Sequence, residues 1–396
     1  MKTIETEVLV VGAGPAGSMT ARYAAKGGAD VLIIEKRQEI GSPVRCAEGI
    51  SQSLLSKVDL TLPEKCVARH VKGAKIFSPA GHCLILSEKQ AGDEVGIVLD
   101  RVFFDKFLAK LAIDEGADVK LKTAATGLIK EGGKIAGVTA TSPEGDLKIK
   151  AKCVVGADGY ESQVGRWGGI DTKLSPRDIT SCFQYRLTGL DYDPDYCEFY
   201  LGSQAPGGYI WVFPKDEETA NVGMGIQLAQ LKTPAQIKQT LDKFIAKDKR
   251  LKNGKPLDMV SGAVSISAPI DKTVIDNLLL VGDSARQIDP ITGGGISNGC
   301  IAGRIAGEAL AGASKKKDFS EKSLQKYENG WRDEMENRLY RNWMAKEKLI
   351  KLSDETFDKI IATLAEVGVE KVSSLAILQA VEKKYPDLVK EFRELL

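Results

Sequence analysis

Three short glycine-containing segments, each placed directly after an apolar run, carry the residue types and spacing most suited to chemistry. The first occupies positions 12–17, reads GAGPAG and follows EVLVV at 7–11, which is predicted to be a short buried strand. In this spacing Gly12 permits a tight turn, Gly14 lets a pyrophosphate approach the backbone, and Gly17 allows a helix to pack closely on a strand. The helix that follows would direct unpaired N–H groups at the phosphates. The segment therefore predicts a dinucleotide site.

A carboxylate completes this first unit. The helical stretch runs to about Lys26, and a second apolar strand at 31–34 ends in Glu35. A carboxylate at that position accepts hydrogen bonds from the adenosine ribose hydroxyls and would repel a 2′-phosphate. A glycine turn alone is often purely structural, but here strand, helix, second strand and acid all follow in the order of a dinucleotide-binding unit.

The second segment favours FAD over NAD. The apolar run 277–281 leads to Asp283, and a glycine turn at 293–295 precedes a helical stretch over 296–311. A carboxylate at a strand end can hydrogen-bond a ribityl hydroxyl. The glycine turn would aim the N–H groups of the next helix at the flavin pyrimidine edge, where they stabilise the anionic reduced ring.

The third segment, GADG at 156–159, contains Asp158 and follows a predicted strand at 153–155. In this order the three segments resemble the FAD-binding family of para-hydroxybenzoate-hydroxylase type. The chain departs from the family at 282–286, which read GDSAR where many aromatic hydroxylases carry GDAAH. The missing histidine puts hydroxylase chemistry in doubt and leaves FAD binding untouched.

The resemblance implies two more contacts with the cofactor. In the family an arginine at the start of the helix predicted for 101–116 reaches the flavin phosphates, which assigns that role to Arg101. The alternative for Arg101 is a surface ion pair. Ala125, after the strand predicted for 118–122, matches the position whose backbone meets the adenine ring.

Two further segments narrow the substrate. Alternation along the strand predicted for 209–213 places Tyr209, Trp211 and Phe213 on one face, where they would form a flat apolar wall above a flavin. The plainer alternative is a sheet whose rings only pack. Together with RCAEGIS at 45–51, this strand resembles the geranylgeranyl reductases and their Tyr-x-Trp-x-Phe-Pro and Cys-x-x-Gly-Ile-Ser segments. The nearest version of that pattern is the archaeal one, which saturates digeranylgeranylglycerophospholipids. Flavin halogenases carry Trp-x-Trp-x-Ile-Pro instead.

From the residues and the resemblance together we expect a set of site residues. The cofactor-binding residues are Gly12, Gly14, Ala16, Gly17, Glu35, Arg45, Cys46, Ala47, Gly49, Arg101, Ala125, Asp158, Asp283, Gly294, Gly295 and Ile296. The catalytic residues are Cys46, Tyr209 and Trp211, and the substrate pocket contains Tyr209, Trp211 and Phe213.

The expected substrate has an isolated C=C bond, and this determines the order of proton transfer and hydride transfer. No carbonyl is present to absorb negative charge, so protonation must lead and hydride from reduced FAD must quench the developing cation. The π faces of Trp211 and Tyr209 would favour that cation by about 0.5–2 kcal/mol each when desolvated. The candidate proton donors are Cys46, Tyr209 and a bound water, with Cys46 favoured. The plainer alternative for Cys46 is a buried inert thiol.

The elements that position these residues predict an α/β fold: a Rossmann-like FAD-binding domain, an inserted antiparallel β-sheet substrate domain and a C-terminal helical region. The strands of the substrate sheet are expected at 182–187, 196–201, 209–213 and 220–226. The domain boundaries are expected at 1–60, 101–175 and 271–315 for FAD binding, 61–100 and 176–270 for the substrate sheet, and 316–396 for the helices. In the last region Val372, Leu375 and Leu378 recur near helical spacing, and Pro386 is expected to start a last short helix.

Composition excludes several other classes of function. The 55 basic and 54 acidic residues give a net charge of +1, so no general attraction to nucleic acid is expected. Seven dispersed cysteines form no Cys-x-x-Cys pair and only two histidines exist, so no metal site is predicted. No apolar run approaches the ~20 residues of a membrane span and no signal peptide is recognised, so we expect a cytoplasmic protein. We expect it to touch the cytoplasmic membrane face only peripherally.

The expected partners are a geranylgeranyl lipid and an external electron donor, for which NADPH, a ferredoxin and a deazaflavin all stay open. Two alternative functions remain at this point. One is an FAD-dependent monooxygenase of an apolar or aromatic substrate, and the other is a non-catalytic prenyl-binding protein.

Overall fold

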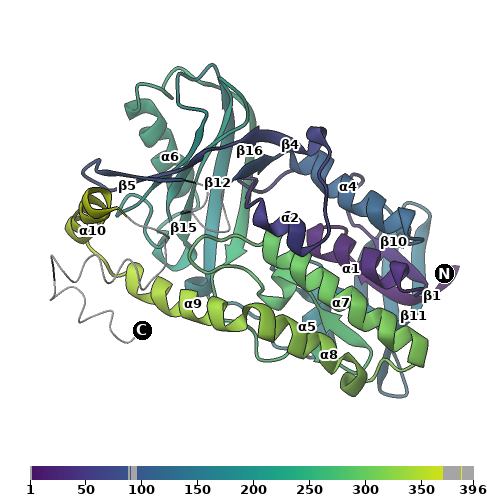
Figure 1. Ribbon diagram of the computed structural model, residues 1–396. Helices are drawn as coiled ribbons and strands as arrows, with labels where there is room; N and C mark the ends of the chain where they lie inside the picture. The colour runs from purple at the N-terminus through teal and green to yellow at the C-terminus, as the bar shows by residue number, and fades with distance from the viewer. Residues whose placement is uncertain (1, 88–89, 91–95, 369–384, 386–396) are drawn as a thin grey trace.

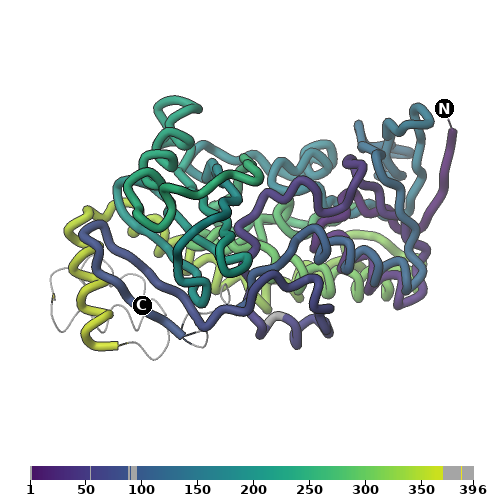
Figure 2. Tube along the Cα trace, turned by 90° about the horizontal axis from the view of Figure 1, so that it is seen from above, coloured from purple at the N-terminus to yellow at the C-terminus, as the bar shows by residue number. Residues whose placement is uncertain are grey.

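The computed structural model describes residues 2–87, 90, 96–368 and 385, and it places two large sheets side by side with helices around them (Figures 1 and 2). The chain begins in the sheet at one end of the molecule and reaches α10 (Asp354–Val367) at the other. This arrangement confirms the predicted α/β fold with a Rossmann-like half, a second sheet and a helical C-terminal region.

The first sheet has the strand order β17-β18-β11-β1-β2-β8, and its central strands are parallel. Its strands are β1 (Lys2–Val11), β2 (Val31–Ile34), β8 (Asp118–Lys120), β11 (Gly145–Gly156), β17 (Val274–Ile275) and β18 (Leu278–Leu280). In addition, β10 (Lys134–Ser142) pairs antiparallel with β11, and β9 (Ala124–Glu131) pairs antiparallel with β10. The innermost segments are buried on both faces, as parallel strands between helices require. β1 begins at Lys2, earlier than the predicted residue 7, because residues 2–6 pair with the long strand β11.

Two helices of this half cross at close range. They are α1 (Pro15–Lys26) and α7 (Ile296–Lys316), and they lie side by side in Figure 1. A Cβ atom on Gly303 would lie 2.6 Å from the carbonyl oxygen of Ala16, so only glycine fits the contact. The predicted early and late glycine segments therefore end up at neighbouring helix N-termini.

The other helices of this half are α2 (Ser53–Lys57), α4 (Arg101–Asp114) and α5 (Gln163–Gly168). Helix α4 starts at the predicted residue, because the side chain of Asp100 caps it by accepting hydrogen bonds from the backbone N–H groups of Val102 and Phe103. Short 3₁₀ turns lie at Glu64–Cys66, Pro176–Asp178, Leu228–Gln230 and Gly282–Ala285.

The second sheet has the strand order β16-β12-β15-β14-β13-β5-β6. Its strands are β5 (Gly73–Phe77), β6 (Cys83–Ser87), β12 (Ile179–Thr188), β13 (Tyr196–Tyr200), β14 (Ile210–Pro214), β15 (Ala220–Gln227) and β16 (Lys255–Ser265). All neighbours are antiparallel except β13 and β5, which are parallel. One face packs on α6 (Gln236–Lys247), whose buried Ile237 and Leu241 join the core of this sheet.

Part of the segment 61–100 forms a small third sheet. Its strands are β3 (Gly49–Ile50), β4 (Val67–His70) and β7 (Ile97–Leu99). Buried side chains of this sheet belong to the same core as α1 and α4. Among the described residues of the segment 61–100, β5 and β6 are the strands that join the substrate sheet.

The C-terminal helices connect both halves. They are α8 (Glu321–Trp331), a π-helical turn at Arg332–Glu336, α9 (Asn337–Leu349) and α10. Trp331 is fully buried in the core of the FAD-binding half, whereas Ile361 and Leu364 of α10 pack on β6. The predicted stripe of Val372, Leu375 and Leu378 and the predicted helix start at Pro386 lie outside the described residues.

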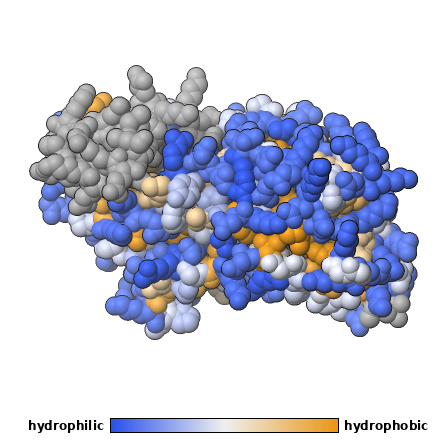
Figure 3. Space-filling view, turned by 90° about the horizontal axis from the view of Figure 1, so that it is seen from below, coloured by the Kyte–Doolittle hydropathy of each residue, from blue (hydrophilic) through white to orange (hydrophobic). Residues whose placement is uncertain are grey.

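Seen from below, the surface is mostly hydrophilic and is interrupted by hydrophobic patches (Figure 3). Among the described residues, no helix combines the length and the apolar character that crossing a membrane would require.

Candidate active site

A cavity of about 1490 Å³ lies between the FAD-binding half and the substrate sheet. Its volume exceeds the ~300–1,000 Å³ typical of a pocket for one small ligand. The lining includes the N-terminus of α1, the loop at 45–49, the sheet strands β12 and β14, and the helices α9 and α10. One continuous space therefore joins the predicted cofactor site to the predicted substrate wall.

The glycine turn at the start of α1 has the geometry of a phosphate-binding turn. Gly12 has φ +114°, and a Cβ atom there would lie 2.3 Å from the carbonyl oxygen of Ala157. A Cβ on Gly17 would lie 2.0 Å from the carbonyl oxygen of Gly12. A Cβ on Gly14 would meet nothing within 4 Å, so the turn leaves open space at the uncapped helix N-terminus. Open space next to the positive end of a helix dipole is what a bound diphosphate requires.

Acidic side chains surround the same end of the site. Glu35 accepts a hydrogen bond from the N–H of Ala13 through Oε2 at 3.0 Å, which ties the end of β2 to the glycine turn. Oδ2 of Asp158 accepts from the backbone N–H of Val164 at 2.9 Å, whereas its buried Oδ1 has no hydrogen-bond partner among the described residues. Burial raises the pKa of Asp283, while Arg101 acts in the opposite direction. These groups fit the hydroxyl-rich ribose and ribityl parts of FAD.

Most of the predicted cofactor residues meet in this cavity. Those on its lining are Gly14, Ala16, Gly17, Arg45, Cys46, Ala47, Gly49, Arg101, Asp283, Gly294, Gly295 and Ile296. The lining does not include Gly12, Glu35, Ala125 or Asp158. Glu35 and the start of β9, which carries Ala125, still lie together, because the N–H of Thr123 donates to the carbonyl of Glu35 at 2.8 Å. An adenine contact at Ala125 stays a prediction.

Arg101 forms an ion pair on the cavity lining, and its contact with the flavin phosphates stays a prediction. Its guanidinium lines the cavity and forms a bidentate ion pair with Asp105, with Nε–Oδ1 at 2.7 Å and Nη2–Oδ2 at 2.8 Å. The pair is buried, since the two side chains are 16% and 6% exposed. It is therefore an ion pair at the cofactor site and not a surface one.

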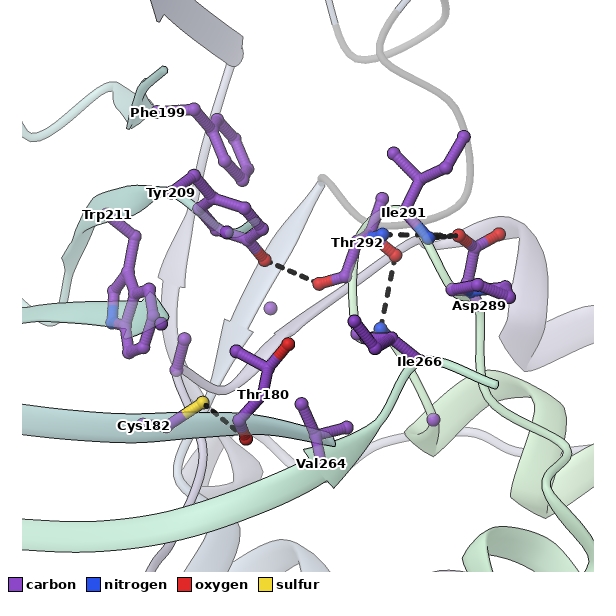
Figure 4. Close-up of a pocket in the computed structure, with 18 of the residues that line it drawn as sticks. Thr180, Cys182, Phe199, Tyr209, Trp211, Val264, Ile266, Asp289, Ile291 and Thr292 are labelled. Carbon is purple, nitrogen blue, oxygen red and sulfur yellow. Dashed lines mark hydrogen bonds between the residues drawn. The ribbon is translucent and has the colours of Figure 1, made fainter. Parts of the chain in front are cut away.

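The predicted aromatic wall exists and is larger than expected. Phe199 of β13 contacts both Tyr209 and Phe213, with ring centroids 5.5 and 5.2 Å apart, and Tyr209 contacts Trp211 at 5.8 Å. Figure 4 shows Phe199, Tyr209 and Trp211 in a row along the cavity. The hydroxyl of Tyr209 donates to the carbonyl of Thr292 at 2.5 Å, so its proton is directed at the glycine-rich loop.

Cys46 lies on the lining of the same cavity as this wall. Its Sγ accepts a hydrogen bond from the N–H of Glu48 at 3.2 Å. Burial raises the pKa of the Cys46 thiol, and the opposing effect of Arg101 is smaller. At neutral pH the thiol therefore carries a proton, which a proton donor needs and a nucleophile does not.

Comparison with known proteins agrees with this geometry. Residues 178–264 match the family described as geranylgeranyl reductase catalytic domain, and residues 7–196 match FAD dependent oxidoreductase. The digeranylgeranylglycerophospholipid reductase of Thermoplasma volcanium is 47% identical over 392 residues, which cover 98% of this chain and 99% of the relative. That of Picrophilus torridus is 45% identical over 395 residues, or 99% of this chain and 100% of the relative. The chain belongs to the digeranylgeranylglycerophospholipid reductase family. It is thus a flavin-dependent reductase with FAD as its cofactor.

Solved structures with a similar fold agree with this family assignment. A geranylgeranyl bacteriochlorophyll reductase-like protein from Thermoplasma acidophilum has a TM-score of 0.94 at 46% identity, and each chain is covered completely. A flavin-dependent brominase has a TM-score of 0.72 at 20% identity, covering 98% of this chain and 100% of the brominase, which shows a shared fold alone.

Sequence reasoning missed a polar network around the Cys46 loop, because no periodicity singles out Gln184 or Glu48. Gln184 donates from Nε2 to the carbonyl of Cys46 at 3.1 Å and accepts from Nε1 of Trp211 at 2.8 Å. Glu48 is fully buried, and its carboxylate accepts hydrogen bonds from residues in both halves of the molecule. The only hint in the sequence was the position of Glu48 inside the segment RCAEGIS.

The apolar end of the cavity was missed as well. Its lining comes from β5, β6 and the segment after β13, together with the last turn of α9, the turn after it and α10. The side chains are Ile76, Leu84, Leu86, Leu201, Leu349, Ile350, Leu352, Phe357, Ile360, Ile361 and Leu364. An amphipathic helix has the same spacing of apolar residues whether its apolar face covers a core or a cavity, so the sequence does not distinguish the two.

Proposed function

We propose that this protein saturates the C=C bonds of geranylgeranyl chains in a membrane phospholipid or its precursor, giving phytanyl chains. The observation that carries this proposal is the continuous cavity, which runs from the phosphate-binding turn past the aromatic wall into a space lined by aliphatic side chains. A C20 chain fits such a lining, because each CH₂ transferred from water contributes about 0.8 kcal/mol. The names of the relatives point to the same class of substrate.

The roles of the residues follow from the needs of an isolated alkene. FAD, when bound and reduced, supplies the hydride. The wall of Trp211 and Tyr209 excludes water and offers π faces to a developing cation. The protonated thiol of Cys46 is the favoured proton donor. Tyr209 is the weaker candidate, since its hydroxyl proton is directed at the carbonyl of Thr292.

An anaerobic experiment tests the proposal without knowledge of the natural electron donor. The purified holoenzyme is reduced with dithionite and mixed with a digeranylgeranylglycerophospholipid. The expected result is a mass gain of the lipid in steps of two hydrogens together with reoxidation of the flavin. Unchanged lipid mass with a stably reduced flavin contradicts the proposal, and a product that gains oxygen on admission of air indicates a monooxygenase.

Replacing Cys46 by alanine is expected to lower the turnover of alkene reduction by about 10²–10⁴-fold, the usual contribution of a positioned general acid. FAD content and the rate of flavin reduction by dithionite are measured in parallel, and the turnover is expressed per bound flavin, because Cys46 also lines the cofactor end of the cavity. Single-turnover kinetics of the C46A variant, followed by flavin absorbance, measure the effect. A C46A enzyme with the turnover of the parent would exclude Cys46 as proton donor.

We further propose a peripheral contact with membranes, since substrate and product both reside there. Tyr340 on α9 is 49% exposed and lies against Trp343, with ring centroids 5.5 Å apart. Aromatic and basic side chains on one helix are typical of membrane interfaces. The opposite face of α9 lines the cavity through residues such as Ala345 and Leu349, so this helix lies between the exposed aromatic pair and the cavity.

Tyr340→Ser is expected to weaken binding to vesicles of phosphatidylglycerol and phosphatidylcholine about fivefold to tenfold, through loss of about 1–1.4 kcal/mol of apolar burial. Phe103→Ser is the matched control, because Phe103 is 46% exposed but lies on α4 in the other half of the molecule. Co-sedimentation with vesicles measures both. Equal losses in the two variants, or no binding by the parent protein, would contradict this contact.

A further inference from the structure

One carboxylate connects the Cys46 loop to the substrate sheet. The side chain of Glu48 is fully buried. Its Oε2 accepts hydrogen bonds from Asn221 Nδ2 at 2.7 Å, Lys215 Nζ at 2.8 Å and Arg186 Nη2 at 2.9 Å. Its Oε1 accepts from the backbone N–H of Arg101 at 2.9 Å. Four donors from α4, β12, β15 and the residue after β14 therefore converge on one group.

The backbone of Glu48 is held in a conformation that glycine would adopt more easily. Its φ is +79°, in the left-handed region where a side chain other than glycine is strained. Its N–H donates to Sγ of Cys46, and its carbonyl accepts from the N–H of Leu99 at 2.8 Å. The thiol is thus bonded to the backbone of the same residue whose side chain is held by four donors.

The strands of the aromatic wall hold the same loop. Asn221 also donates from Nδ2 to the carbonyl of Ala47 at 3.2 Å, and Gln184 bridges the indole of Trp211 to the carbonyl of Cys46. Consecutive residues of the loop are therefore bound to the sheet that carries the wall. A shift of the loop would change the distance between thiol and wall.

We propose that Glu48 is a positioning residue for alkene reduction, which fixes the Cys46 thiol relative to the aromatic wall. This inference rests on the proposed role of Cys46 as proton donor. Positioning has a large effect, since a misplacement of about 1 Å can lower a rate about 100-fold. The charged and titratable groups that face Cys46 are Arg101 from α4, Cys182 from β12 and Glu48 itself.

Glu48→Gln tests the inference, because the amide keeps the shape of the side chain and loses its charge. We expect retained FAD absorbance, a fall in kcat of about 100-fold and a nearly unchanged KM for the lipid. The alkylation of Cys46 by iodoacetamide, read by peptide mass spectrometry, should become faster relative to Cys83. Its pH midpoint should fall, because Glu48 raises the pKa of the Cys46 thiol and that charge is removed.

Glu48→Gln leaves Lys215 buried beside an amide, so loss of stability must be separated from loss of position. The double variant Glu48→Gln/Lys215→Met removes both charges and should recover the urea midpoint of the parent without recovering kcat. Glu198→Gln is the matched control, since Glu198 is also fully buried in this sheet and pairs with Arg250, while its neighbour Phe199 faces the cavity. It should lower the urea midpoint and preserve both kcat and the alkylation profile.

The outcomes distinguish the proposed positioning role of Glu48 from the proposed proton-donor role of Cys46. Recovery of kcat in the double variant, or parental kcat and alkylation in Glu48→Gln, overturns the positioning role. If Glu48→Gln does not fold, the double variant alone decides between these results. A fully active Cys46→Ala enzyme overturns the proton donor, and the change in Cys46 alkylation then still reports whether Glu48 fixes the thiol.

Discussion

Replacing Gly14 by alanine is expected to weaken FAD binding at least about tenfold, or ~1.4 kcal/mol, while leaving the stability of the apoprotein almost unchanged. Gly14 has φ −71° and ψ 178°, a conformation that alanine adopts without strain. Its Cβ would meet no protein atom within 4 Å. The methyl group would instead occupy the space in which a diphosphate approaches the N–H groups of α1.

Gly17→Ala provides the contrast to this prediction. A Cβ on Gly17 would lie 2.0 Å from the carbonyl oxygen of Gly12, so this variant should lose stability and FAD together. Titration of each apoprotein with FAD, followed by flavin fluorescence, gives the affinity, and urea unfolding gives the stability. A Gly14→Ala protein that is as yellow as the parent would show that the cofactor does not pass over this turn.

The backbone geometry of this glycine turn also explains why the turn could be predicted from the sequence. The positive φ of Gly12 and the close approach at Gly17 are local needs of one turn, and local backbone geometry restricts the residue type directly. The same holds for Tyr209, Trp211 and Phe213, whose common face follows from the period of a strand. Signals of this kind are contained in a few neighbouring residues.

The pairing of β-strands that are distant in the sequence could not be predicted, because it leaves no such local signal. β5 at 73–77 lies parallel to β13 at 196–200, although the two strands are separated by more than a hundred residues. Residues 2–6 became part of β1 only because β11 extends along them. Periodicity predicts a strand and one buried face, but it does not name the partner.

The position of Glu48 shows the same limit for the catalytic site. An isolated glutamate in a sequence is most often exposed. Glu48 is buried because Arg186 of β12, Asn221 of β15 and Lys215, the residue after β14, approach it from segments that are distant in sequence. The network that binds the Cys46 loop is therefore a property of the tertiary fold. Arg45, Cys46, Ala47 and Gly49 were singled out from the sequence, whereas Glu48 was not.

The contact between α1 and α7 determines whether the two halves of the cofactor site meet, and Gly303→Ala tests it. A Cβ on Gly303 would lie 2.6 Å from the carbonyl oxygen of Ala16 and 2.8 Å from Cβ of Met19. The helices must separate to accept it, which we expect to lower the free energy of unfolding by about 1–3 kcal/mol. FAD affinity should fall as well, since the N-termini of α1 and α7 both line the cavity.

Gly312→Ala on the same helix is the matched control for Gly303→Ala. Its Cβ would meet nothing within 4 Å, so the substitution changes helix propensity alone and should raise stability by up to about 1 kcal/mol. Urea unfolding and FAD titration of both variants separate helix propensity from helix contact. Equal stability and equal FAD affinity in the two variants would mean that α7 can shift without disturbing the flavin, and the cofactor site would then depend on the glycine turn of α1 alone.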